Sequence, residues 1–379
     1  MRLIWHSNSP TTNSGYGKQS ALFIPRIVAA GHEIAAIASP YTFGGCPITW
    51  NDIPVLGTAR DVSGNDVLPQ NHEYFGADWT VVLADAFALR KCAPILRDIN
   101  VAMWTPVDCS PLGVGDVTVL RESQALPIAM SRFGQQMLAD EGCLDPLYIP
   151  HGVDMSIYKP GERSTYRETV PEITDDTFVI GVAAMNKDVS RKAFQEQFLA
   201  FAEFHRGHPD SFLAVHSSPG GGTNLQALAA RLGISAAVGF PDSYSYDLSL
   251  ISEENMATWY NGLDVLSLCS YGEGFGLPLI EAQACGIPVI TTDASAMSEL
   301  CGAGWLVSGT PFWQDGHQSW WVRPDAEDIA NAYELAYEAR EAGQLPQKPA
   351  FEFAQKFAVD RVFEDCWKPV LAQLEERIK

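Results

Sequence analysis

The residues best suited to chemistry in this chain lie in one short segment, residues 271–281. The segment holds two carboxylates, Glu273 and Glu281, eight positions apart, with glycines and a proline between them. The apolar run at 264–270 predicts a buried strand, and the run at 278–285 predicts a helix because proline suits the first helical turn. Glu273 would then lie in the turn and Glu281 within the first helical turns, at the carboxyl edge of a parallel sheet. Open α/β sheets bind their ligands at that edge.

The backbone around the glycines is expected to bind an anion. The amides of Gly274, Phe275, Gly276 and Leu277 would point at whatever lies beyond the strand, and the helix dipole favours negative charge there. A carboxylate beside a phosphate site usually binds ribose or sugar hydroxyls, so two carboxylates suggest a ligand with hydroxyls at two places, such as a sugar nucleotide. The alternative is that both acids are solvated residues at a helix start, stabilised by the dipole.

A second loop supplies cations. The strand predicted at 178–184 is followed by Lys187, Arg191 and Lys192, which would lie in or beside a loop at the same sheet edge. Cations at a helix start oppose the helix dipole, so they need another justification. Binding a diphosphate and stabilising its charge as it leaves would provide one. The alternative is a solvated basic helix start.

The segment with the two carboxylates resembles a conserved signature of a known protein family. The run Glu-Gly-Phe-Gly-Leu-Pro-Leu-Ile-Glu-Ala-Gln-Ala-Cys-Gly-Ile-Pro-Val-Ile, residues 273–290, resembles the E-x7-E signature of retaining glycosyltransferases of family 4. The resemblance covers most of the chain, strongly in the second half and loosely in the first, where it is similar to bacterial and bacteriophage members. It extends to residues 252–264, to 150–154 with His151 where Asn is usual, and to 5–9 and 14–17.

This resemblance implies a role for each residue of the two loops. Glu281 would accept hydrogen bonds from the nucleotide ribose, and Glu273 would hold the donor sugar and its phosphate together with the amides of 274–277. In the family, an Arg and a Lys five residues apart bind the departing diphosphate. Here that spacing holds Lys187 and Lys192, and Arg191 would replace the missing bidentate contact. We therefore expect Lys192 and Glu273 to be catalytic.

The first half of the chain contributes fewer candidates. Gly15 and Gly17 lie in a Ser-Gly-Tyr-Gly loop whose amides could approach the donor diphosphate, or could simply form a tight turn. Asp108 follows a predicted strand at roughly the place where many relatives have a functional His. It is our third catalytic candidate and would orient the acceptor or the donor sugar, or else cap a turn. His151 and Asp154 are expected to be structural.

The alternation of strands and helices predicts an α/β fold with two Rossmann-like, parallel-sheet domains. The resemblance implies that the domains face a cleft, which is the GT-B architecture, and that the last helix crosses back to the first domain with Trp367 as an anchor. We predict an N-terminal acceptor-side domain at 1–155, a linker at 156–176, a donor-nucleotide-binding domain at 177–358 and the returning helix at 359–379. Residues 41–67 are expected to be irregular.

Composition bounds the partners. The 379 residues carry a formal net charge of −21, which argues against a broad nucleic-acid or anionic-lipid footprint but leaves a local basic groove open. The chain starts directly in a strand-like run without a signal peptide or membrane span, so we expect a cytoplasmic protein. The eight cysteines show no C-x-x-C spacing and are expected to be free thiols. The pair His205 and His208 is expected to be a surface pair, and no metal or required cofactor is expected.

The sequence thus predicts a retaining glycosyltransferase that uses a nucleotide-diphosphate sugar as co-substrate, with UDP favoured and GDP next. The acceptor hydroxyl stays open among glycans, proteins, lipids, small molecules and modified DNA bases, as does the oligomeric state. The alternatives are a sugar phosphorylase or sugar-nucleotide epimerase of the same fold, or an inactive sugar-nucleotide-binding module. Retention of Lys192, Glu273 and Glu281 argues against the inactive module.

Overall fold

The structure of the protein, a computed structural model, describes residues 1–39, 48–57 and 60–378. The chain divides into two compact units. The first comprises Met1–Gly152, Gln314–Ser319 and Phe357–Lys379, and the second comprises Val153–Trp313 and Trp320–Lys356.

The first unit is built on an eight-stranded sheet of order β3-β4-β2-β1-β5-β6-β7-β8, in which every neighbouring pair is parallel except β3–β4. Its strands are β1 (Arg2–His6), β2 (Glu33–Ser39), β3 (Ile48–Trp50), β4 (Ile53–Gly57), β5 (Trp79–Leu83), β6 (Val101–Thr105), β7 (Leu126–Ala129) and β8 (Leu147–Tyr148). Strands β5, β6 and β7 are buried along their whole length. This burial explains their continuous apolar sequence, because a parallel sheet is covered on both faces.

Strands β3 and β4 lie within residues 41–67, which we expected to be irregular. The two strands form a tight antiparallel hairpin in which Trp50 pairs with Ile53. The two residues between them, Asn51 and Asp52, have φ angles of 47° and 62°. Asn and Asp tolerate this left-handed conformation, which a two-residue hairpin turn requires.

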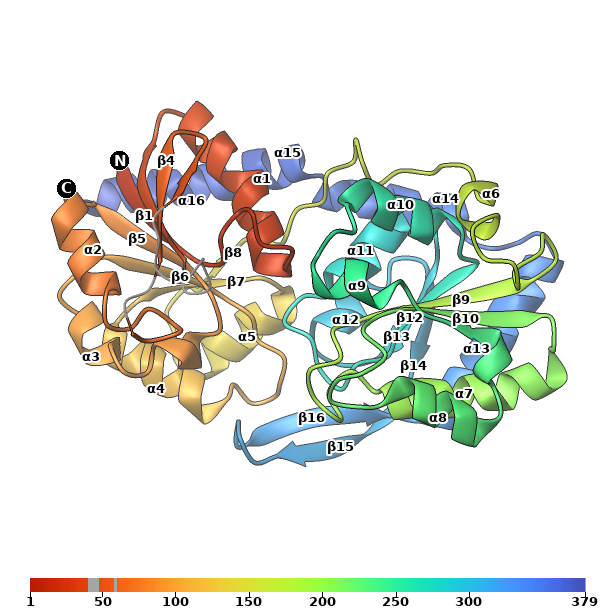
Figure 1. Cartoon of the computed structure of the whole chain (residues 1–379). Helices are drawn as coiled ribbons and strands as arrows, with labels where there is room; N and C mark the ends of the chain where they lie inside the picture. The colour runs from red at the N-terminus through yellow and green to blue at the C-terminus, as the bar shows by residue number, and fades with distance from the viewer. Residues whose placement is uncertain (40–47, 58–59, 379) are drawn as a thin grey trace. The chain divides into compact units, whose positions relative to one another are not determined.

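The helices of the first unit surround the sheet (Figure 1). They are α1 (Gly15–Ala29), α2 (Leu68–Phe75), α3 (Ala93–Leu96), α4 (Val114–Ser123), α5 (Arg132–Asp140), α15 (Val359–Val362) and α16 (Lys368–Ile378), with a 3₁₀ turn at Ala86–Leu89 and a π-helical turn at Phe363–Trp367.

The C-terminal helices pack on the first unit, as predicted. Trp367 is fully buried, and its ring centroid lies 5.7 Å from that of Trp5, 5.6 Å from that of Phe23 and 5.1 Å from that of Trp104. The segment is not one continuous helix, however, because the π-helical turn separates α15 from α16. The aromatic cluster anchors the end of the chain to β1, α1 and β6.

The second unit is built on a six-stranded parallel sheet of order β11-β10-β9-β12-β13-β14. Its strands are β9 (Phe178–Ala183), β10 (Ser211–His216), β11 (Val238–Gly239), β12 (Val265–Leu268), β13 (Val289–Thr292) and β14 (Gly304–Val307). Its helices are α6 (Ser164–Arg167), α7 (Phe194–Gly207), α8 (Leu225–Leu232), α9 (Ser243–Asp247), α10 (Glu253–Asn261), α11 (Leu277–Ala284), α12 (Ser295–Leu300), α13 (Ala326–Glu341) and α14 (Gln347–Ala354), with a 3₁₀ turn at Ser235–Ala237. A further 3₁₀ turn at Gln355–Phe357 follows α14, where the chain passes into the first unit.

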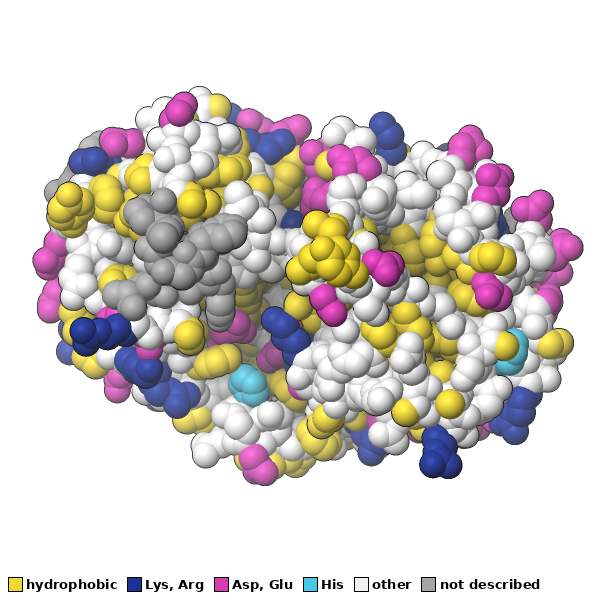
Figure 2. All heavy atoms as spheres, in the orientation of Figure 1, with side chains coloured by type: hydrophobic (Ala, Val, Ile, Leu, Met, Phe, Trp, Pro, Cys, Tyr) yellow, Lys and Arg dark blue, Asp and Glu magenta, His cyan; other side chains and the backbone are white. Residues whose placement is uncertain are grey.

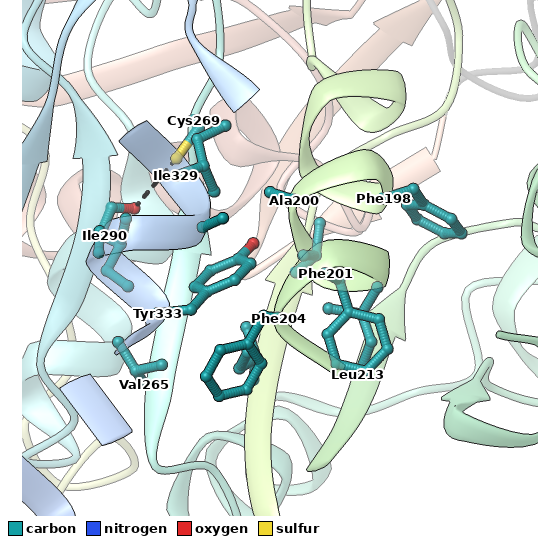
Figure 3. Packing of buried hydrophobic residues seen from close by; sticks show 14 of the residues in the cluster. Phe198, Ala200, Phe201, Phe204, Leu213, Val265, Cys269, Ile290, Ile329 and Tyr333 are labelled. Carbon is teal, nitrogen blue, oxygen red and sulfur yellow. Dashed lines mark hydrogen bonds between the residues drawn. The ribbon is translucent and has the colours of Figure 1, made fainter. Parts of the chain in front are cut away.

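The core of this unit lies between the sheet and helices α7 and α13 (Figure 3). Phe198, Phe201 and Phe204 project from α7, and Tyr333 projects from α13 between them and the strands. The Tyr333 hydroxyl donates a hydrogen bond to the Ser267 hydroxyl at 3.0 Å, so this buried phenol is satisfied. The core fixes the sheet whose carboxyl edge carries the site.

Residues 156–176, predicted as the linker, lie in the second unit. Helix α6 falls within them, and Arg167 at its end is buried. The Arg167 guanidinium pairs with the buried Asp264 carboxylate at 2.8 Å and also donates to the Gly262 carbonyl at 3.0 Å. The ion pair between Arg167 and Asp264 therefore holds this polar segment against the rest of the second unit.

A two-stranded ribbon, which the sequence did not lead us to expect, follows β14. It consists of β15 (Gly309–Gln314) and β16 (Ser319–Pro324). Its tip, Gln314–Ser319, groups with the first unit. There the Val114 amide donates to the His317 carbonyl at 3.0 Å, which fixes the start of α4.

The surface carries acidic and basic side chains in scattered positions on the face shown in Figure 2, with small hydrophobic groups between them. Across the described ranges, no helix combines the length and apolar character needed to cross a membrane. The seven cysteines in those ranges are free thiols, while Cys46 lies outside them.

Candidate functional site

The segment 271–281 folds as the sequence predicted. Strand β12 ends at Leu268, a turn follows, and α11 begins at Leu277 with Pro278 in its first turn. Gly276 precedes the helix with φ of 111°, a conformation that a side chain would strain. The turn therefore needs glycine at this position, and it delivers the start of α11 to the carboxyl edge of the sheet.

Glu273 is the centre of a charged network at this edge. Its side chain is 10% exposed, and its Oε1 contacts the Lys192 ammonium. The Arg191 guanidinium lies 3.2 Å from Oε2, and the Ser270 hydroxyl donates to Oε1 at 2.5 Å. The Glu273 amide donates to the Ser295 hydroxyl at 3.0 Å. The loop that carries Arg191 and Lys192 and the turn at Ser270 thus hold the carboxylate, while Ser295 holds the backbone amide.

The cations determine the charge state of this acid. Burial favours the neutral acid, but the charges of Lys192 and Arg191 outweigh burial and lower the pKa of Glu273 to about 2. Burial also lowers the pKa of Lys192, and the Glu273 charge opposes that shift. At neutral pH the carboxylate is ionised and is held by two cations.

The loop between β9 and α7, residues 184–193, carries Lys187, Arg191 and Lys192 and is called the basic loop below. Its own side chains fix its shape. The Arg191 amide donates to the Asp188 carboxylate at 2.6 Å, which turns the chain so that Arg191 faces Glu273. Asn186 is buried, and its amide nitrogen donates to the Thr223 carbonyl at 2.7 Å. A Cβ at Gly221 would lie 2.1 Å from the Asn186 carbonyl oxygen. The glycine-rich loop after β10 therefore has to approach the basic loop backbone to backbone.

Tyr271 lies in the turn between β12 and α11 and connects this turn to the basic loop. Its amide donates to the Arg191 carbonyl at 2.8 Å, and its hydroxyl donates to the Glu196 carboxylate at 2.8 Å. The Val322 amide of β16 donates to the Tyr271 carbonyl at 3.0 Å. Sequence reasoning missed Tyr271 and Ser295, because contacts between separate loops leave no local pattern. It also missed Ser270, although its contact with Glu273 spans only three positions.

Glu281, the second acid of the signature, is in a different environment from Glu273. It lies in α11 and is 5% exposed. The Tyr260 hydroxyl from α10 donates to its Oε2 at 2.9 Å. The two carboxylates are therefore held differently, Glu273 by cations and Glu281 by a phenol.

The remaining predicted residues of this edge have less contact with the network. Lys187 lies on the same loop but is exposed. Gly274 and Phe275 are buried, whereas Gly276 and Leu277 are partly exposed at the start of α11. Their amides are the ones closest in sequence to the helix start, where an anion is favoured.

In the first unit, the predicted glycine loop forms the start of α1. The Ser14 hydroxyl caps the helix by accepting from the Gly17 amide at 3.1 Å. A Cβ at Gly17 would lie 2.2 Å from the Thr12 carbonyl oxygen. Close packing thus explains Gly17, and its amide serves the helix cap. Gly15 is the first residue of the helix.

Asp108 lies just beyond β6 in the first unit and is half-buried. A neighbouring acid that sequence reasoning missed, Asp116, accepts a hydrogen bond from the Phe87 amide at 2.8 Å. Burial, with the charges of Asp85 and Asp108, raises the pKa of Asp116 to about 7. The end of β6 is therefore an acidic region of the first unit.

The histidines fit structural roles. His151 is buried with its ring 5.1 Å from that of Trp104, and burial lowers its pKa to about 3, so it is neutral. The His208 ring nitrogen lies 2.8 Å from the Glu334 carboxylate. No group of three or more potential metal ligands occurs among the residues that the structure describes.

Known proteins match both the sequence and the fold. Residues 162–344 match the family model described as Glycosyl transferases group 1. D-inositol 3-phosphate glycosyltransferase 2 of Catenulispora acidiphila is 31% identical over 170 residues, which make up 42% of this chain and 38% of that protein. The D-inositol 3-phosphate glycosyltransferase of Rhodococcus opacus is 30% identical over 286 residues, 71% of this chain and 58% of that protein. The chain thus spans about two fifths to three fifths of the length of these relatives.

Solved structures match nearly the whole chain in fold. Sucrose-phosphate synthase from Thermosynechococcus elongatus matches with a TM-score of 0.75 and 16% identity, over 100% of both chains. Anabaena Alr3699/HepE in complex with UDP-glucose matches with a TM-score of 0.71 and 16% identity, over 98% of this chain and 100% of that one. Identities this low speak for the fold alone, and they confirm the predicted GT-B fold. Residues 162–344 thus match the glycosyl transferases group 1 model, and the chain has a GT-B fold.

Proposed function

We propose that this chain is a retaining glycosyltransferase that moves a sugar from a nucleotide-diphosphate sugar, with UDP as the first candidate nucleotide, to a hydroxyl acceptor. The observation that carries the proposal is the cluster of Arg191, Lys192 and Glu273 at the carboxyl edge of the second sheet, beside the start of α11. A neighbour of the same fold was solved with UDP-glucose, which supports UDP as the first nucleotide to test.

The cluster is suited to a diphosphate because its cations are already gathered around an anion. A diphosphate would compete with Glu273 for Lys192 and Arg191, and the α11 amides would add positive potential. Displaced from one cation, the Glu273 carboxylate could accept hydrogen bonds from donor-sugar hydroxyls. Glu281 would accept from the ribose. Because the cations and amides already supply positive charge, we propose that turnover needs no divalent metal and survives EDTA.

The transfer step follows from this arrangement. The bond between the sugar anomeric carbon and the diphosphate oxygen breaks, and its electron pair goes to the diphosphate, whose charge Lys192 and Arg191 stabilise. The acceptor oxygen forms the new bond on the same face of the sugar, which retains the configuration. The acceptor proton passes to the departing phosphate oxygen.

The acceptor is assigned to the first unit, where Asp108 is the candidate for orienting the acceptor or the donor sugar. Relatives named for D-inositol 3-phosphate make that compound the first acceptor to test. Sugar phosphates come next, because a neighbour of the same fold is named as a sucrose-phosphate synthase.

The test is a melting-temperature panel with UDP-, GDP-, ADP- and TDP-sugars, followed by a transfer assay with the best donor and a range of acceptors. We expect one nucleotide series to stabilise the protein and its sugar to appear, with retained configuration, on an acceptor. Stabilisation by none of the four would contradict the proposal. Phosphorolysis or epimer formation in place of transfer would favour the phosphorylase or epimerase alternatives, and binding without turnover would favour the inactive module.

A further inference from the structure

Glu281, the acid proposed to bind the ribose, is buried and accepts a hydrogen bond from a buried tyrosine. Tyr260 is completely buried, and its hydroxyl donates to Glu281 Oε2 at 2.9 Å. The two residues are 21 positions apart and belong to separate helices, α10 and α11. A buried phenol needs a partner, and here the carboxylate provides it.

A second phenol lies beside the first. Tyr158 is 2% exposed, and its ring centroid lies 6.1 Å from that of Tyr260 at 62°. Burial and the negative charge of Glu281 raise the pKa of Tyr158, and the same two causes raise the pKa of Tyr260. Both phenols therefore stay protonated and can donate to the carboxylate.

The hydrogen bond from Tyr260 affects how the Glu281 carboxylate can bind a ligand. The phenol of Tyr260 carries no charge, so its contact restrains the Glu281 carboxylate without neutralising it. An ionised carboxylate offers about four acceptor positions, and its hydrogen bonds to hydroxyls are the strong, charge-assisted kind. Tyr260 occupies one position on Oε2 and limits rotation of the carboxylate plane. A ligand hydroxyl would then meet an acceptor that is already oriented.

We infer that Tyr260 is a positioning residue for Glu281 and thereby sets the preference of this protein for ribose over deoxyribose in its nucleotide donor. The inference rests on the proposed donor-binding function and deepens it. The ribose preference then depends on two residues: Glu281, which would contact the ribose, and Tyr260, which holds Glu281 in place.

The experiment compares wild-type protein with Tyr260→Phe, Glu281→Gln and the double variant. Affinities are measured by calorimetry for the ribo, 2′-deoxy and 3′-deoxy forms of UDP and GDP. Tyr333→Phe is the matched control, since Tyr333 (Figure 3) is also fully buried in this unit. It also donates one hydroxyl bond, but to Ser267.

We expect wild-type protein to prefer a ribo form over at least one deoxy form by about ten-fold or more, as for a hydrogen bond to a charged group. Tyr260→Phe should weaken binding of the ribo form several-fold and leave the deoxy form unchanged. In the Glu281→Gln background the same substitution should have no further effect on the preference. Tyr333→Phe should keep the wild-type preference.

Other outcomes overturn the inference. Equal weakening of ribo and deoxy forms by Tyr260→Phe would mean a merely structural role, and an unchanged preference would mean no role. If wild-type protein binds nucleotides without a ribose preference, this inference fails while the proposed function stands. Binding of no nucleotide would instead defeat the proposed function itself.

Where Tyr260→Phe does not fold, 3-fluorotyrosine at position 260 keeps the shape of the side chain and makes its hydroxyl a stronger hydrogen-bond donor. It should change the affinity for the ribo form alone, and unchanged affinity would overturn the inference.

Discussion

Lys192 and Glu273 form an ion pair although they lie 81 positions apart, on the loops that follow strands β9 and β12. The pair is largely buried, with 12% and 10% of the two side chains exposed. Arg191 reaches the other oxygen of the same carboxylate at 3.2 Å. One buried carboxylate thus gathers both cations at one point, where the proposed diphosphate would compete with Glu273 for them.

Replacing Lys192 with Ala should reduce turnover about 10²–10³-fold, because the developing charge on the diphosphate loses one of its two cations. The measurement is the rate of sugar transfer at saturating donor. Lys348→Ala, which removes an exposed lysine of the same unit, is the control and should keep the wild-type rate. Turnover within a factor of about three of wild type in Lys192→Ala would remove this residue from the mechanism.

Glu273 gives the stability of the protein a defined dependence on pH. Its folded pKa of about 2 lies below its ordinary value of 4.5. The carboxylate therefore stabilises the fold fully above pH 4.5, and the contribution fades as the pH falls toward 2, with a size of roughly 3 kcal/mol. The free energy of unfolding of wild-type protein should exceed that of Glu273→Gln at pH 6, and the gap should narrow at pH 3. A gap that stays constant would show that the ion pair does not hold this acid.

Gly221 tests whether the glycine-rich loop shapes the basic loop. A Cβ at this position would overlap the Asn186 carbonyl oxygen, so Gly221→Ala should displace the loop that carries Arg191 and Lys192. We expect a loss of about 1–3 kcal/mol in stability, together with weaker nucleotide binding. The neighbouring Gly220 has open space around its Cβ position, so Gly220→Ala is the matched control. Equal behaviour of the two variants in melting and binding experiments would argue against this loop contact.

His151 predicts a second, separate pH effect. Burial lowers its pKa to about 3, so the folded protein leaves it neutral while the unfolded chain binds a proton below pH 6.5. Stability should therefore fall as the pH drops below 6.5, by about 1.4 kcal/mol per pH unit for this residue. His151→Asn should make denaturant-induced unfolding less sensitive to pH between 6.5 and 4. The buried His6, whose pKa is lowered to about 4, would leave a remaining slope. An unchanged slope in the variant would contradict the buried neutral state.

Much of the donor edge could be predicted because its signals are local. Proline and glycine fix the start of α11, and near-continuous apolar runs mark the buried strands on either side. The roles within the basic loop needed the structure. The family spacing pointed to Lys187 and Lys192, yet Lys187 is exposed, and the turn made by Asp188 brings Arg191 to Glu273 instead.

Other features depend on contacts between distant segments. The hydrogen bond from Tyr260 to Glu281 forms because α10 and α11 pack together, and the sequence of neither helix indicates that packing. The β15–β16 ribbon interrupts the expected helix–strand alternation, although the Asp-Gly pair at 315–316 is a turn signal within it. Asp116 is unusual because of its burial and its acidic neighbours, which belong to the fold rather than to a motif.

Calorimetric titration with UDP-glucose, GDP-mannose and the ADP- and TDP-sugars of the melting panel measures whether the Lys192–Glu273 cluster binds a sugar-nucleotide donor. We predict saturable binding of at least one donor with one site per chain, weakened about ten-fold or more by Lys192→Ala and also by Glu281→Gln, with Lys348→Ala as the unaffected control. Binding of none of these four donors, or binding that both substitutions leave unchanged, would contradict a donor site at this cluster.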